Sequence, residues 1–390
     1  MPRSRITYRQ LLIGVPFFWA ISGCSGPMGS EPAGSDPTGS NPMLGTALEA
    51  AQADALHESG SMHRFNRSGN ILISDQFNNR VIEIDKGGDI VWSFGLGPND
   101  VSADSIVGVN DAQRVGALTL MAGTGAPPGS EPLCAAGCPD NRVALVSPRG
   151  RIVWQYGQFG VTGADADQLS APVQSTWLPN FHVLITDQGN SRIIEVTLDK
   201  EIVWQYGTTG LPGNGPDQLD NPNSAELLEN GHILISDENN DRVIEVNRHK
   251  DIVATFTAGG TVSGVAFASR LSNGNTLITD GNNSRAVEVD PSDRVVWQYV
   301  TNSDSGSNPS PLPSRAVRLK NGDTVVSDQF NHRVIRVDHA TPAHVVASYG
   351  NLNQPGFGTE NAAQGLNGPY DAKVNGDFTG LTPPFGHDFD

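Results

Sequence analysis

The sequence predicts an all-β fold, a six-bladed β-propeller in which each blade is a sheet of four antiparallel strands. A similar segment recurs six times, with its arginine repeating every 43 to 62 residues. Each copy contains short runs of β-branched and aromatic residues separated by polar turns, which is the pattern of strands. The 44 glycines and 26 prolines among 390 residues also suit many strands joined by tight turns.

The first residues have the features of an export signal. Arginines within residues 3–9 precede an apolar run over residues 11–20, which is too short to span a membrane. The following Ile21-Ser22-Gly23-Cys24 resembles a bacterial lipobox, in which the cysteine thiol receives the lipid. We therefore expect a lipoprotein signal peptide over residues 1–23 and lipid on Cys24. The alternative is an ordinary cleaved signal with an incidental cysteine.

The segment after the signal is predicted to be a tether. Residues 24–56 are rich in Gly, Ser and Pro near their start, and such a composition cannot bury a core. The propeller is then expected over residues 57–355, and residues 356–390 are expected to form a closing strand or cap. This organisation predicts an exported, monomeric protein of the bacterial cell envelope, facing the periplasm or the surface, with a lipid as its only membrane contact.

The charge of the chain excludes one class of partner. The formal net charge is −17, and no cluster of Lys or Arg occurs along the sequence. Nucleic-acid binding needs a basic surface that displaces counterions from the phosphates. We therefore expect no nucleic-acid partner.

The repeat itself defines the strands of a blade. Intact copies begin at Gly69, Phe181, Gly231, Gly274 and Gly322, as in GHILISDENNDRVIEV from Gly231. A sixth copy keeps only its second half in register, NRVALVSPRGRIVWQYG from Asn141. A fourth strand precedes each glycine, and the last strand alternates with period two, so that its aromatic residues share one face. A four-stranded unit of this kind cannot bury both faces alone, so the units must stack around a ring.

The way the ring closes is left open by the sequence. The segment 367–384 starts like another innermost strand but lacks the rest of a blade. It could complete the first blade, cap the ring or begin a reduced seventh blade, because residues 61–70 also resemble the inner strand of the first blade.

The core G-x-[IVT]-[LV]-[IV]-[ST]-D-x-x-N-x-R-[VI]-[IV]-E-[VI] resembles the NHL repeat over roughly residues 60–355. The Gly-rich connectors 157–172 and 207–222 agree with this resemblance. It implies a β-propeller and no single function, because NHL relatives include binding scaffolds, lyases and proteins without known activity. The trailing VWQYG is more weakly similar to quinoprotein-like and aryl sulfotransferase propellers.

Each intact copy places an aspartate five residues before its arginine, on either side of one hairpin turn. We expect the two side chains to pair across the turn and fix the strand register, rather than to form a ring of acids that binds a cation. The pairs are Asp75 and Arg80, Asp187 and Arg192, Asp237 and Arg242, Asp280 and Arg285, and Asp328 and Arg333. An intervening asparagine is expected to form the turn, and the residues are Asn79, Asn190, Asn240, Asn283 and, offset by one, Asn331.

A long connection interrupts the second blade between Gly123 and Asn141. It contains Cys134 and Cys138, which we expect to form a disulfide in an oxidising compartment, with two free thiols as the alternative. Long insertions on one face of a repeat fold often build a binding surface or lid. The alternative is a surface loop that the fold tolerates without such a role.

One position of the innermost strands differs in chemistry from blade to blade. The residues there are Gln174, Ser224, Phe267, Arg315 and Asp371. They are expected at the channel mouth, where they could orient a small polar ligand, although Arg315 and Asp371 could also pair with each other. His332 replaces a smaller polar residue on a turn and is a further candidate for binding.

These observations favour a binding or protein-interaction module, whose partner would be an envelope protein, a glycan or a small polar ligand. No catalytic motif, phosphate loop or set of metal ligands at suitable spacing occurs, so no cofactor is predicted and we lean against an enzyme. One alternative is an envelope lyase or hydrolase that uses a divalent metal on the channel axis. Another is a purely structural assembly partner.

Overall fold

A computed structural model describes residues 53, 63–129, 132–358 and 365–377. The predicted signal peptide, Cys24 and all of the tether except residue 53 lie outside these residues. Among the residues that are described, no helix is long and apolar enough to cross a membrane.

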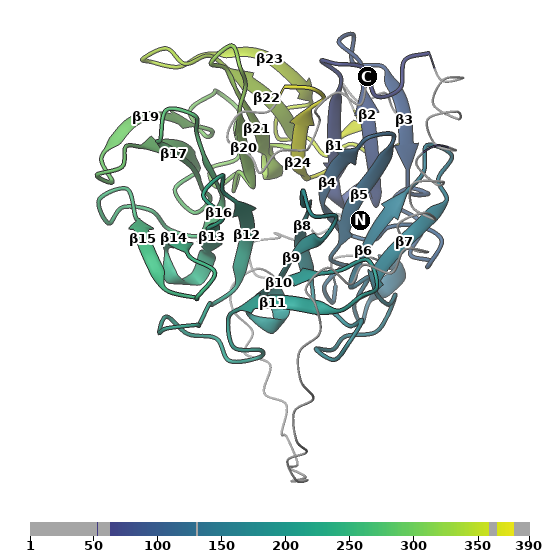
Figure 1. The fold of residues 1–390 in the computed structure, drawn as a ribbon. Coiled ribbons are helices and arrows are strands. Elements are labelled where there is room, and N and C mark those ends of the chain that lie inside the picture. The colour runs from purple at the N-terminus through teal and green to yellow at the C-terminus, as the bar shows by residue number, and fades with distance from the viewer. Residues whose placement is uncertain (1–52, 54–62, 130–131, 359–364, 378–390) are drawn as a thin grey trace. The chain divides into compact units, whose positions relative to one another are not determined.

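The fold consists of six antiparallel sheets of four strands arranged in a ring, which is a six-bladed β-propeller (Figure 1). Blade 1 contains β1 (Ile71–Asp75), β2 (Arg80–Ile84), β3 (Ile90–Phe94) and β24 (Pro369–Val374). Blade 2 contains β4 (Val109–Val115), β5 (Leu118–Gly123), β6 (Arg142–Val146) and β7 (Ile152–Gly157). Blade 3 contains β8 (Pro172–Trp177), β9 (Val183–Asp187), β10 (Arg192–Val196) and β11 (Ile202–Tyr206).

The remaining three blades follow in chain order. Blade 4 contains β12 (Pro222–Leu227), β13 (Ile233–Asp237), β14 (Arg242–Val246) and β15 (Ile252–Phe256). Blade 5 contains β16 (Val265–Arg270), β17 (Thr276–Asp280), β18 (Arg285–Val289) and β19 (Val295–Val300). Blade 6 contains β20 (Arg315–Arg318), β21 (Thr324–Asp328), β22 (Arg333–Val337) and β23 (Val345–Gly350).

Short 3-10 turns connect the second and third strands of four blades. They are η2 (Gln76–Asn78), η4 (Gln188–Asn190), η5 (Glu238–Asn240) and η6 (Gln329–Asn331), and η3 (Pro132–Cys134) lies in the long β5–β6 connection. Each of the four turns ends in a residue with left-handed backbone, at Asn79, Ser191, Asp241 and His332. These turns lie at the same end of the blades as the linkers from the preceding blade, and we call this end the linker side.

The ring is closed by β24, which pairs with β1 from Ile71 opposite Val374 to Asp75 opposite Pro369. β24 is therefore the innermost strand of blade 1, which removes the exposed edge that β1 would otherwise present. Residues 63–66 form a turn instead of the inner strand that their sequence resembles. The described part of the C-terminal segment, residues 365–377, supplies β24 to blade 1 and does not begin a seventh blade.

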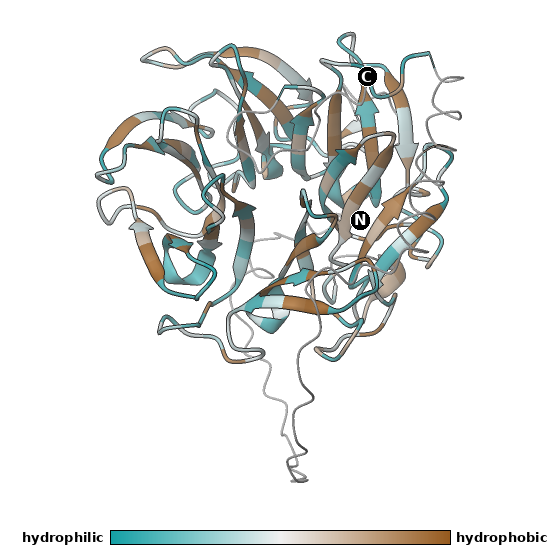
Figure 2. Ribbon diagram, viewed as in Figure 1, coloured by the Kyte–Doolittle hydropathy of each residue, from teal (hydrophilic) through white to brown (hydrophobic). Residues whose placement is uncertain are grey.

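The hydrophobic core is divided among the six interfaces between neighbouring blades, with one buried cluster at each. Alternate residues of a strand serve opposite interfaces. In β13, Leu234 packs toward blade 5, whereas Ile233 and Ile235 pack toward blade 3. Figure 2 shows hydrophobic stretches along the strands, interrupted there by hydrophilic ones. Because successive side chains of a strand point to opposite faces, each sheet packs hydrophobic residues against both neighbouring blades.

Candidate functional site

The Asp–Arg pairs of the repeat form as predicted. In each of the five hairpins the arginine Nε lies 2.7–2.8 Å from the aspartate Oδ2. The asparagine three residues after the aspartate also donates to the carboxylate, and these residues are Asn78, Asn190, Asn240, Asn283 and Asn331. Asn78 therefore takes this role in blade 1 in place of the predicted Asn79, and Asn331 is in register and not offset. Burial raises the pKa of Asp328 to about 6, against the opposing effect of Arg333.

Blade 2 builds the same arrangement from different residues. β5 ends at Gly123, where the other blades have aspartate, and Asp140 accepts from Arg142 Nε at 2.5 Å. The second oxygen of Asp140 accepts from the backbone N–H of Val107 at 2.7 Å, as the repeat aspartates do from their own linkers. A Cβ at Gly123 would lie 2.5 Å from Asp140 Oδ2. Gly123 is required because the carboxylate occupies the space of its side chain.

Five inner-strand residues predicted to be equivalent do occupy equivalent register positions, and they are Gln174, Ser224, Phe267, Arg315 and Asp371. Each is at most 4 % exposed, so they lie within the propeller and not at an open mouth. The sixth member of this inner ring is Asp111, opposite Ala122 in blade 2. Asp111 is hard to recognise from the sequence because its strand lacks the proline that starts several of the other copies.

The inner ring links four pairs of neighbouring blades through side chain to backbone hydrogen bonds. Four of the six side chains accept from the N–H of the residue that follows the ring position in the next blade. The bonds run from Ala112 to Asp371, from Ser175 to Asp111, from Ala225 to Gln174 and from Ala268 to Ser224. Phe267 has no polar group, and the Arg315 guanidinium lies 4.2 Å from its ring centroid instead.

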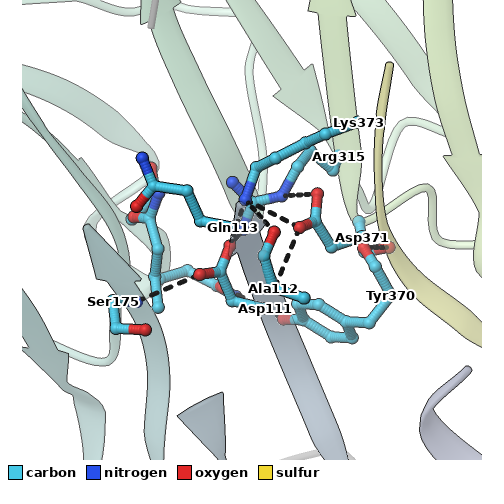
Figure 3. A network of polar contacts seen from close by, with 12 residues as sticks. Asp111, Ala112, Gln113, Ser175, Arg315, Tyr370, Asp371 and Lys373 are labelled. Carbon is cyan, nitrogen blue, oxygen red and sulfur yellow. Dashed lines mark hydrogen bonds and ion pairs between the residues drawn. The ribbon is translucent and has the colours of Figure 1, made fainter. Parts of the chain in front are cut away.

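The two carboxylates of the inner ring are compensated by Arg315 of the ring and by the neighbouring Lys373 (Figure 3). Arg315 pairs with Asp371 at 2.8 Å and with Asp111 at 3.0 Å. Lys373, two residues further along β24, lies 2.7 Å from Asp111 and 2.8 Å from Asp371. Burial raises the pKa of Asp111. At Asp371 burial acts in the same direction, but Arg315 and Lys373 outweigh it and lower the pKa.

These residues do not suit an axial divalent metal. Both carboxylates of the inner ring already contact two cationic side chains, so a metal ion would have to displace Arg315 and Lys373 against their repulsion. Elsewhere in the described ranges, no three or more His, Cys, Asp or Glu side chains gather as a metal site would require.

A second polar cluster lies at the linker-side end of the inner strands. Tyr370 in β24 donates from its hydroxyl to Oδ1 of Asn223 in β12 at 2.9 Å. Blades 1 and 4 are three positions apart in a ring of six, so this bond spans the axis. Gln76 donates to Asn110 of blade 2 and accepts from Gln329 of blade 6. Polar groups of four blades therefore meet at this end.

Glu238 is the charged residue of this cluster. Its Oε2 accepts from the amides of Asn221 at 2.9 Å and Asn223 at 2.7 Å. Burial raises the pKa of Glu238 to about 7, and the charges of Asp220 and Asp241 act in the same direction. The sequence contained one signal for this residue, since the corresponding positions of the other intact copies are Gln76, Gln188, Gly281 and Gln329.

His332 lies at the seam where the ring closes. Its Nδ1 accepts a hydrogen bond from the backbone N–H of Gly368 at 3.1 Å, directly before β24. Burial lowers the pKa of His332 to about 4, which keeps the ring neutral and able to accept this bond. This position joins His332 to the closing segment and not to the inner ring.

The predicted disulfide between Cys134 and Cys138 is present, with the two Cα atoms 5.5 Å apart. The surrounding loop is held by paired backbone hydrogen bonds between Ala126 and Cys138. Gly160 of the next linker donates to the carbonyl of Pro139. The loop joins the second and third strands of its blade, β5 and β6, and thus belongs to the linker side.

Comparison with known proteins supports the fold class and goes no further. No family model and no curated protein matches the chain. A protein of unknown function from Bacteroides caccae is 16 % identical, with a TM-score of 0.50 over 72 % of this chain and 93 % of that chain. A streptogramin B lyase is 15 % identical, with a TM-score of 0.49 over 80 % of this chain and 87 % of that chain. Membership of the NHL family stays a prediction.

Proposed function

We propose that this protein is an exported, lipid-anchored propeller that binds a small polar ligand or an envelope partner through its linker-side face and channel end. The supporting observation is the contrast between two polar layers. In the inner ring, Arg315 and Lys373 compensate Asp111 and Asp371. In the linker-side cluster, no Lys, Arg or His among the described residues forms an ion pair with Glu238.

The two layers have different roles in this proposal. The inner ring, with Gln174, Ser224 and Phe267, forms a rigid support, because its side chains are buried and joined from blade to blade. The linker-side cluster supplies amides, a hydroxyl and a carboxyl, which are the groups that orient a small polar ligand. The disulfide-bridged loop of blade 2 lies on the same side and offers a surface for a larger partner.

A retention experiment tests the binding role. Full-length protein is dialysed against an envelope extract, and the small molecules that it retains are identified by mass spectrometry. We expect a compound that the wild type retains and that the combined Asn223→Ala and Glu238→Ala variant loses. Glu201→Gln, which removes one exposed carboxylate at the outer rim, is the matched control and should retain the compound. Equal retention by the wild type and the double variant would contradict the proposal.

The anchor is tested separately. Replacing Cys24 by Ser removes the thiol that would carry the lipid, so the protein should move from the membrane fraction to the soluble periplasm or the medium. Fractionation followed by immunoblotting measures this change, and unchanged partition into membranes would remove the lipid anchor from the proposal. The observed disulfide agrees with an oxidising compartment outside the cytoplasm.

A further inference from the structure

The charges around Glu238 are all of one sign. The neighbouring turn and linker bring Asp220 and Asp241 close enough to raise its pKa. Asp220 accepts from Asn239, and Asp241 accepts from the backbone of Gly264, so both acids face neutral donors. From blade 1 the facing titratable group is the Tyr370 hydroxyl, which is neutral at physiological pH because burial raises its pKa. Within the part of the chain that the structure describes, no cationic side chain forms an ion pair with this carboxylate.

The hydrogen bonds of Glu238 leave one side of the carboxylate unused. Both amide donors go to Oε2, and within the described ranges no donor reaches Oε1. Tyr370 cannot supply one, because its proton is already donated to Asn223. The Glu238 side chain is half-buried, so Oε1 is a free acceptor that a ligand with a donor group can reach.

The equivalent positions of the other blades show that this charge is particular to blade 4. Residues at the same place after the second strand are the neutral Gln76, Thr124, Gln188, Gly281 and Gln329. Gln329 donates a hydrogen bond to Gln76 across the interface between blades 6 and 1, so two neutral side chains satisfy each other there. The fold therefore accepts uncharged residues here, and a carboxyl is not needed to build the ring.

On the basis of the proposed binding function, we infer that the linker-side cluster takes a small organic cation of the primary ammonium class, with Glu238 as its counter-ion. An ammonium brings the positive charge and the N–H donors that Oε1 lacks. The amide oxygen of Asn221 is a second acceptor beside the carboxylate. A neutral sugar would satisfy the hydrogen bonds but leave the charge uncompensated. A divalent metal would find a single carboxylate, which is too few for its charge.

Three matched probes test this inference, namely ethanolamine, ethylene glycol and glycolate, which are a cation, a neutral molecule and an anion of similar size. Binding to the full chain carrying Cys24→Ser is measured by saturation-transfer NMR at pH 8 and pH 6. We expect ethanolamine to bind best at pH 8 and about tenfold more weakly at pH 6, since a group of pKa about 7 is then mostly protonated.

Two variants distinguish an effect of the Glu238 charge from an effect on the folded structure. Glu238→Gln keeps the shape of the side chain, so it should weaken ethanolamine binding at least tenfold and abolish the pH dependence, whereas the rim control Glu201→Gln should change neither. Equal binding of ethanolamine and glycolate, or unchanged binding in Glu238→Gln, would overturn the inference.

If ethylene glycol binds as well as ethanolamine and Asn223→Ala abolishes both, the binding function stands and the cation class is wrong. Binding of none of the three probes would also reject the cation class, and the dialysis experiment would then decide the binding function alone.

Discussion

Tyr370 and Asn223 belong to opposite blades, and the hydroxyl of the first donates a 2.9 Å hydrogen bond to the side-chain oxygen of the second. The bond joins the closing strand β24 directly to the far side of the ring. It also holds Asn223 so that its amide nitrogen donates to Glu238 at 2.7 Å. The two residues therefore connect ring closure with the proposed ligand site.

Removing this bond should cost a modest amount of stability. We expect Tyr370→Phe to lower the free energy of unfolding by about 1 kcal/mol, which is usual for one buried hydrogen bond. Denaturant unfolding measures the loss. Tyr349→Phe on β23 is the control, because the Tyr349 hydroxyl makes no hydrogen bond within the described residues. Equal stability of the two variants would show that the bond across the axis does not contribute.

Breaking the charge balance of the inner ring should cost more. Lys373→Met leaves Asp111 and Asp371, in a buried site, with Arg315 as the one cationic partner that the described residues provide. Removing one partner of a buried ionic group typically costs about 3–5 kcal/mol. Lys86→Met, at an exposed turn of blade 1, removes the same charge and should be nearly neutral. A similar small effect for both variants in thermal unfolding would contradict a structural role for Lys373.

Restoring the repeat aspartate in blade 2 should destabilise the protein. Gly123→Asp places a side chain where the Asp140 carboxylate lies, with Cβ 2.5 Å from Oδ2, so we expect a loss of roughly 1–3 kcal/mol. Combining it with Asp140→Gly frees this space and lets the new carboxylate reach Arg142. The double variant should regain most of the loss in a denaturant titration. Additive losses would mean that Asp140 does not replace the repeat aspartate.

The stability of the protein should depend on the ionisation of Glu238. Its folded pKa of about 7 lies above the unfolded value near 4.5, so the folded state binds the proton more tightly. The free energy of unfolding should therefore fall as the pH rises from about 4.5 to about 7. Glu238→Gln removes this contribution, so the variant should gain stability relative to the wild type over that window. Parallel pH profiles of the two proteins would refute the raised pKa.

Much of the fold could be predicted because the repeat encodes it locally. An aspartate and an arginine that flank one hairpin meet whenever the hairpin forms, so Asp187 and Arg192 could be paired from spacing alone. The same holds for Cys134 and Cys138, which are four residues apart. The sequence does not identify the closing strand, because residues 61–70 and 367–384 both resemble an inner strand. The pairing of β24 with β1 distinguishes them.

The polar sites were harder to predict because they depend on contacts between blades. Asp111 lies in the blade with the most degenerate repeat, and its partners Arg315 and Lys373 are more than 200 residues away. Glu238 occupies a turn position that varies between copies, and its burial becomes visible only when Asn223 and Tyr370 are brought beside it. Sequence periodicity shows which face of the sheet a residue lies on, but it does not show which residue of another blade it contacts.

The pairing of β24 with β1 also sets the order in which the molecule can fold. The two residues at one end of this pairing, Ile71 and Val374, are separated by 303 positions, so β1 must wait for its partner while five complete blades form. Until residues 369–374 have been synthesised, the first blade lacks its innermost strand and has an open edge. Closure of the ring therefore depends on one contact between distant parts of the chain. A protein cut short before residue 369 would keep that edge exposed and be prone to association with other chains.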